Sequence, residues 1–151
     1  MPAEGQAVRT IAIVMLLAMS LACTKQPTET ATQSVFSDQA KELAAIPPAD
    51  PTKYPNWHDL RDWKNPYLVV REDGIGYVDM ANNEIRILKP EDIPSVLAAL
   101  PESAWPYGRV VLVSQATPKD SSDQAKAEIR KNRGLLIGTL DEVKVQVHEA
   151  P

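Results

Sequence analysis

The densest group of titratable and aromatic side chains lies between positions 57 and 63. Trp57, His58, Asp62 and Trp63 fall on successive turns of a short predicted helix, which places an imidazole and a carboxylate near two indole rings. One interpretation is a platform for a glycan or peptide, or the site of a small enzyme. The favoured interpretation is that the rings fill one end of the core, because large aromatic side chains mostly bury their area. A metal needs more ligands than this cluster offers, so no metal or cofactor is expected.

Other catalytic arrangements have no counterpart in the sequence. Gly74 and Gly76 belong to a hairpin turn and not to a strand-to-helix turn, so no phosphate-binding loop is predicted. There is no serine nucleophile elbow and no Cys–His pair. Nothing singles out a carboxylate pair among the 20 acidic residues. The sequence therefore predicts a protein without catalytic activity.

The only cysteine, Cys23, ends an apolar run over 11–22 that is interrupted only by Ser20. Twelve helical residues reach about 18 Å, short of the roughly 30 Å of hydrocarbon in a bilayer, which favours a signal peptide over a spanning helix. The segment Ser20-Leu21-Ala22-Cys23 resembles the lipobox of bacterial lipoproteins, although that family prefers Leu where Ser20 stands. The resemblance implies cleavage before Cys23 and a lipid anchor on it. The alternatives are a plain cleaved signal and an uncleaved anchor.

The residues around the predicted cleavage site also suggest a location and partners. Thr24, and not Asp, follows the cysteine, which by the sorting rule of enteric-type lipoproteins favours the outer over the inner membrane, facing the periplasm. Removing 1–22 takes away Glu4 and Arg9, so the net charge stays at −4. No basic patch is present, and nucleic acid is not expected as a partner. The expected partners are a membrane, through the lipid, and an envelope protein or the cell wall.

Composition divides the chain into three regions. Residues 1–22 are the predicted signal peptide. Residues 23–55 are a predicted lipid-anchored tether, because they are polar at first and then rich in proline; a short helix over 34–46 is possible within it. Residues 56–151 form a single predicted domain.

The domain is predicted to have a two-layer α+β fold. We expect an antiparallel-rich sheet of about five strands with two helices on one face. Three strands joined by tight turns are predicted over 68–88, and helices over 90–100 and 123–140, the second with a break near Gly134. The continuous apolar run at 109–114 predicts a central strand buried on both faces, or a strand whose outer face is covered by the tether.

The last predicted strand carries Val143, Val145 and Val147 in alternation with polar residues. Its position near the chain end predicts an edge strand, whose unpaired backbone groups can bind a further strand. We expect these valines to contribute to contacts with a second copy or a partner segment. The alternative is an interior strand. His148 is expected on the exposed face.

The predicted order, three strands, helix, strand, helix, strand, resembles the periplasmic domain of the ExbD/TolR family. The resemblance covers about 67–148 and rests on four segments: VVREDGIGYVD (69–79), IPSVLAAL (93–100), PYGRVVLV (106–113) and VKVQV (143–147). It implies a two-layer α+β fold, dimerisation, and contacts with a partner or the cell wall.

The resemblance does not extend to a motor role. The family's membrane helix carries a proton-bearing aspartate, whereas 11–22 has no ionisable side chain. The predicted function is therefore a lipid-anchored, exported interaction module without catalysis. The alternative is a small cell-envelope enzyme or glycan-binding subunit that uses the region of Trp57 to Trp63.

Overall fold

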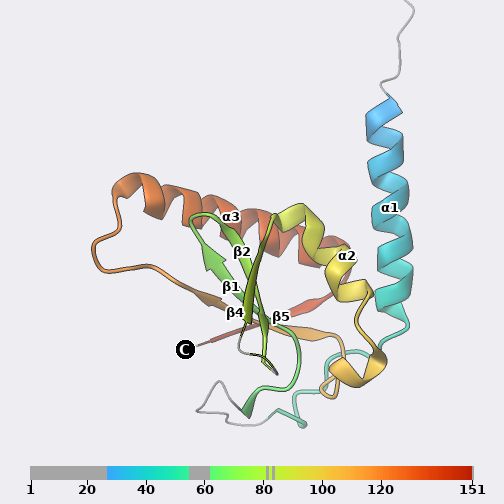
Figure 1. The fold of residues 1–151 in the computed structure, drawn as a ribbon. Coiled ribbons are helices and arrows are strands. Elements are labelled where there is room, and N and C mark those ends of the chain that lie inside the picture. Colours follow the sequence, from blue (N-terminus) through green and yellow to red (C-terminus); the bar gives the residue numbers. More distant parts are fainter. Residues whose placement is uncertain (1–26, 55–61, 81, 83, 151) are drawn as a thin grey trace, which may run out of the picture.

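The computed structural model describes residues 27–54, 62–80, 82 and 84–150, with side chains from Phe36 onward. One five-stranded sheet, with the order β3-β2-β1-β4-β5, carries the helices on one of its faces (Figure 1). The α-helices are α1 (Pro27–Ala44), α2 (Ile93–Ala98) and α3 (Asp123–Glu142). The strands are β1 (Tyr67–Arg71), β2 (Gly74–Asp79), β3 (Glu84–Leu88), β4 (Val110–Gln115) and β5 (Gln146–Glu149). Short 3-10 turns cover Pro90–Asp92 and Glu102–Ala104.

The predicted α+β class and the five strands are confirmed, and the sheet is mixed. β1, β2 and β3 form the predicted antiparallel meander. β4 and β5 add to it in parallel, because α2 and α3 each carry the chain back across the helical face before the next strand begins. The sequence predicted an antiparallel-rich sheet, and the structure has two antiparallel and two parallel strand pairings.

The central strand β4 is buried on both faces, as predicted. Val111 and Val113 point into the main core beneath the helices. Val110 and Leu112 point to the opposite face, where Tyr54 and Trp63 cover them. The sheet therefore has helices on one side and, over β4, aromatic residues from loops on the other.

The N-terminal region packs against the domain more extensively than a tether would. α1 begins at Pro27, where the sequence predicted a disordered stretch, and proline suits the first turn of a helix. Leu43 and Ile46, which the sequence assigned to the tether, are 0% and 8% exposed in the main core. The packed unit thus begins upstream of position 56. Cys23 and the signal peptide lie outside the described residues.

The proline-rich segment after α1 runs beside the start of β4. The Arg109 amide donates to the Pro47 carbonyl at 2.8 Å, and the Asp50 amide donates to the Tyr107 carbonyl at 2.9 Å. Gly108 makes this approach possible: its φ is +79°, and an added Cβ would lie 2.2 Å from the Pro48 carbonyl oxygen. The segment predicted to be a spacer is therefore bonded to the sheet.

Helix α3 is continuous through the predicted break near Gly134. The side chain of Asn132 is buried and donates from Nδ2 to the Arg71 carbonyl at 2.9 Å, which ties the helix to the β1–β2 turn. The helix then ends in a turn at Lys144, whose φ is 59°. This turn takes up 143–145, so the last strand begins at Gln146 and not at Val143.

Candidate interaction surface

Trp63, one of the two predicted ring-platform residues, is a core residue. It is 2% exposed and stacks on His148, with ring centroids 5.6 Å apart and an interplanar angle of 5°. Tyr54 contacts it edge-on at 5.5 Å. The favoured interpretation, that the rings plug one end of the core, is confirmed for Trp63. Trp57 and His58 lie outside the described residues.

Asp62 is exposed, and its contact runs through the backbone. The Tyr107 hydroxyl donates to the Asp62 carbonyl at 3.1 Å. Burial raises the pKa of Tyr107, and the nearby Asp62 charge raises it further. This hydrogen bond links the segment at Asp62 to the loop that precedes β4.

His148 was expected to be exposed, and that prediction is wrong. The imidazole is half-buried between Trp63 and Tyr54, whose ring centroid lies 5.3 Å away. The reason is that aromatic residues from loops cover this face of the sheet, which the sequence had predicted to be exposed.

In the part of the chain that the structure describes, no three His, Cys, Asp or Glu side chains gather where they could hold a metal.

The three valines predicted to support partner binding lie mostly in the core. Val143 is 1% exposed and Val145 is 5% exposed, and both precede the strand. Val147 is half-buried against the same core cluster. Their alternation follows the helix-terminating turn, in which the Val145 amide donates to the Leu140 carbonyl at 2.9 Å. Val143 and Val145 therefore cannot present side chains to a partner.

The β2–β3 hairpin carries the exposed apolar residues of the sheet. Ile85 is 51% exposed and Ile87 is 40% exposed, on the sheet face opposite the helices; Met80, at the hairpin end, is 42% exposed. Gly76, paired with Ile87, adds no side chain to this face, and an added Cβ would lie 2.9 Å from the Ile85 side chain. We call Ile85 and Ile87 the isoleucine strip.

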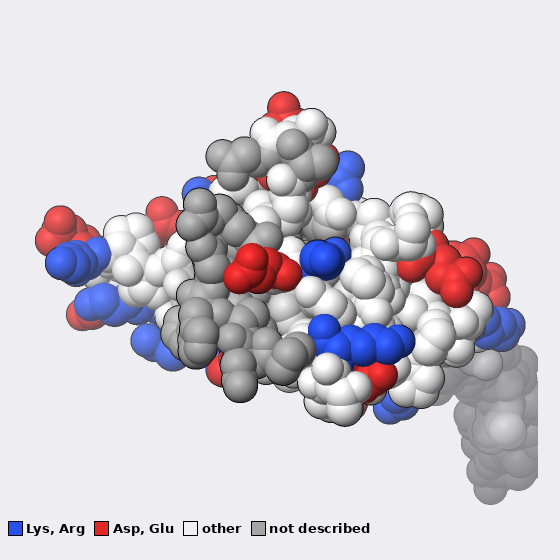
Figure 2. Space-filling model, turned by 90° about the horizontal axis from the view of Figure 1, so that it is seen from below, with Lys and Arg blue, Asp and Glu red and all other residues white. Residues whose placement is uncertain are grey.

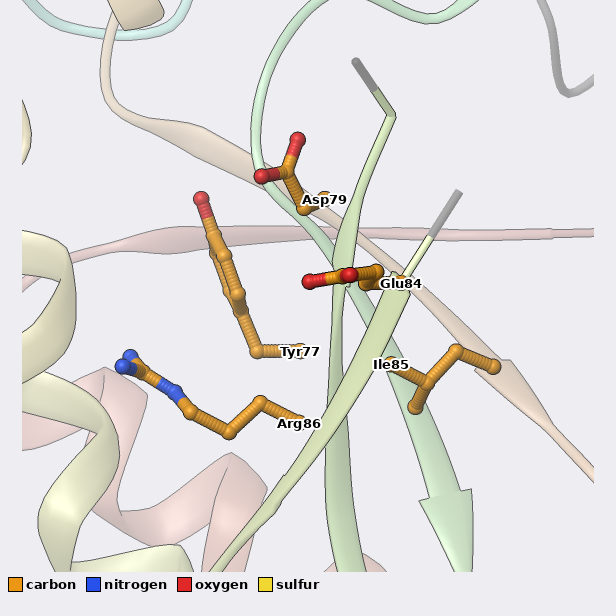
Figure 3. Close-up of a pocket in the computed structure, with 5 residues that line it drawn as sticks. All are labelled: Tyr77, Asp79, Glu84, Ile85 and Arg86. Atoms are coloured by element: carbon orange, nitrogen blue, oxygen red, sulfur yellow. The ribbon is translucent and has the colours of Figure 1, made fainter. Parts of the chain in front are cut away.

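The other face of the same hairpin is polar and slightly hollow. A shallow depression there is lined by β2 and β3 residues, and Figure 3 shows Tyr77, Asp79, Glu84 and Arg86 extending to one side and Ile85 to the other. The Arg86 guanidinium lies 5.8 Å from the centre of the Tyr77 ring. Burial raises the pKa of Tyr77, the Asp79 charge adds to this rise, and Arg86 opposes it.

Two carboxylates face each other across this polar face. Asp79 of β2 pairs in register with Glu84 of β3. Like charges directly opposite each other weaken a sheet. The Asn82 amide donates to Asp79 at 2.9 Å and reduces the repulsion. Glu84, at the outer side of the pair, is the carboxylate that a cation from outside the sheet could reach.

The described residues on the face seen from below are of mixed charge. Figure 2, which views the molecule from below, shows acidic and basic side chains interspersed among uncharged ones over the described part of that face. Such a pattern gives no broad field of one sign to attract a polyanion.

The sequence did not predict the isoleucine strip. Its signal was the alternation of Glu84 to Leu88 opposite a strand that carries Gly74 and Gly76.

Comparison with known proteins identifies no relative. No family model, no curated protein and no solved structure matches the chain. The resemblances to bacterial lipoproteins and to the ExbD/TolR domain therefore stay predictions. Among the described helices, none combines the length and the apolar character needed to cross a membrane.

Proposed function

We propose that the protein is an exported, lipid-anchored interaction module that binds an envelope protein or the cell wall without catalysis, and that the β2–β3 hairpin is its contact surface. The observation that carries the proposal is the isoleucine strip. Two β-branched side chains 40% or more exposed on one face of an edge strand are an exposed apolar surface of the kind used in protein contacts.

The geometry favours strand-mediated contact over ligand enclosure. The hollow on the polar face is open, and the residues that line it come from two adjacent strands. A small-molecule site is usually concave and enclosed by several elements. Trp63, one of the two tryptophans that suggested a glycan platform, is buried in the core.

The anchor part of the proposal rests on the apolar run that ends at Cys23. α1 begins four residues after this cysteine and continues for 18 residues, about 27 Å at 1.5 Å per residue. A lipid on Cys23 would thus be followed almost directly by a helical stalk. We expect Cys23→Ser to prevent lipid attachment and release the chain from the membrane fraction. A variant that is processed and fractionates like the parent would contradict the anchor.

The contact surface is tested by photo-crosslinking in cells. A photoreactive amino acid replaces Ile85 or Ile87 in the full chain, and the matched control replaces Leu135, which is 49% exposed on α3. We expect discrete adducts from the two β3 positions and few from Leu135. Equal labelling at all three positions would show that β3 is ordinary surface.

A further inference from the structure

We infer that the partner of β3 is β3 of a second copy, paired antiparallel about a two-fold axis at Ile85, so that the two sheets join into one of ten strands. This inference rests on the proposed contact surface and names its occupant. β3 has β2 on one side and no strand on the other among the described residues. Four of its five residues, Glu84 to Ile87, are exposed. Unpaired backbone groups along such an edge accept a further strand.

The sequence of β3 selects the register of this pairing. With the axis at Ile85, Glu84 of each copy lies opposite Arg86 of the other, giving two opposite-charge pairs on the polar face. The two Ile85 side chains meet on the other face. Moving the axis to Arg86 would set two guanidinium groups against each other, and moving it to Ile87 would set Arg86 against Leu88. Charge complementarity therefore favours one register.

The pairing would also place a positive charge beside the two neighbouring carboxylates of each copy. Asp79 and Glu84 are opposite each other in register, and the second copy would add its Arg86 on the outer side of Glu84. The resulting row across the joined sheet is Asp79, Glu84, then the second copy's arginine. Each Glu84 would then lie directly opposite the other copy's Arg86.

The axis is compatible with attachment to one membrane. A two-fold axis perpendicular to the sheet keeps the helices of both copies on the same face. Figure 1 shows that α1 extends beyond α3 on the helical side of the sheet. Both copies of α1 would therefore extend from the same side of the joined sheet. Both predicted lipid anchors would then lie on the same side of the joined sheet and could insert into one bilayer.

The first test is thiol crosslinking of the full chain in bacterial membranes. Ile85→Cys puts two thiols next to the axis, within reach of a short bismaleimide. Leu135→Cys is the matched control, and the parent reports any background from Cys23. We expect at least tenfold more crosslinked dimer from Ile85→Cys than from either control. Yields equal to those of the controls would overturn the inference.

The second test reverses the charges in the Ile85→Cys background. Glu84→Arg alone sets arginines against arginines, and Arg86→Glu alone sets acids against acids, so each should reduce the crosslink about tenfold. The double reversal, E84R/R86E, restores complementarity and should restore the crosslink. Co-expression of the two single variants should do the same. A crosslink that neither single reversal reduces would overturn the register, as would a failure of the double reversal to restore it.

The outcomes separate this inference from the proposed function. If Ile85→Cys gives no homodimer while photo-crosslinking at Ile85 still gives adducts with another envelope protein, self-pairing is wrong and the interaction surface stands. If neither method gives adducts at β3, both are wrong. Thermal melts of each variant, monitored by circular dichroism, show whether a loss reflects unfolding.

Discussion

The two edges of the sheet differ in what surrounds them. β5 is four residues long, and its first amide, Gln146, donates inward to the Arg109 carbonyl at 3.0 Å. Its last residue, Glu149, forms an ion pair with Arg133 of α3. β3 has five residues, and its two isoleucines are exposed. Both strands are edges, but only β3 combines an open side with exposed apolar side chains.

This difference shows that position at an edge does not by itself give a strand exposed apolar side chains. Backbone groups alternate between the two sides of a strand, and the Gln146 amide faces inward, to the Arg109 carbonyl. A proline substituted for Gln146 would therefore break this inner bond and leave the outer side of β5 unchanged. The valines near β5 support the core, whereas the isoleucines of β3 do not. The following substitutions test the comparison, beginning with the largest expected effect.

Of the substitutions near β4 and β5, Gly108→Ala should lower the stability of the fold the most. An alanine there needs an unfavourable positive φ and would place its Cβ 2.2 Å from the Pro48 carbonyl oxygen. We expect Gly108→Ala to lower the free energy of unfolding by about 3 kcal/mol in a chemical denaturation experiment. The matched control is Gly134→Ala on α3, where an added Cβ meets nothing within 4 Å. That control should gain up to about 1 kcal/mol from helix propensity.

Asn65→Ala should give the second-largest loss of stability. The buried Asn65 amide donates to the carbonyls of Gly108 and Val110 at 2.7 and 2.8 Å and accepts from the Tyr107 amide at 3.0 Å. Asn65→Ala removes all three hydrogen bonds, although the Gly108 carbonyl still accepts from the Val110 amide at 2.8 Å. We expect a loss of about 2.5 kcal/mol in unfolding free energy. Asn82→Ala, on the exposed β2–β3 turn, should change it by less than about 0.5 kcal/mol. Similar losses would mean that the hairpin is as tightly supported as β4.

A pair of truncations compares the edges directly. Val145→Ala removes buried volume and should cost about 1.5 kcal/mol of unfolding free energy. Ile85→Ala removes an exposed side chain and should cost no more than about 0.5 kcal/mol. Both are measured by thermal melts at low protein concentration, where self-association is suppressed. If Ile85→Ala proved the more destabilising, the strip would be part of the folded core.

The smallest effect should be a gain at the turn before β5. Lys144 has a φ of 59°, which glycine adopts without strain. We expect Lys144→Gly to raise the unfolding free energy by about 0.5 kcal/mol. Lys144→Ala is the control, because it removes the charge and keeps the strain, so it should give no gain. Equal gains in unfolding free energy from both variants would show that the loss of the charge, and not the relief of backbone strain, is responsible.

Much of the architecture follows from local patterns in the sequence. The meander, the helix beginning near Pro90 and the doubly buried β4 all appear where hydrophobic periodicity and turn residues predicted them. These features depend on neighbours a few positions apart. The alternation at Val143 and Val145 predicted a strand, whereas both residues lie in a helix-terminating turn, which can also bury every second residue.

The candidate surface depended on contacts between distant segments. From sequence alone, Trp63 and Asp62 stood out because they were polar or aromatic and close together, whereas Ile85 and Ile87 looked like ordinary strand residues. Only the sheet order places β3 at an edge, and only the loop over β4 buries Trp63.

The amino-acid sequence by itself determined the α+β class, the principal strands and the charge alternation of β3. The tertiary structure decided which edge strand exposes apolar side chains and which aromatic residues are core. It also decided that α1 and the proline segment belong to the packed unit. The reason is physical: secondary-structure preference arises from local sterics and periodicity, whereas exposure depends on which remote residues cover a side chain. Pro47 and Gly108 meet only after the chain has folded, and no local pattern records that contact.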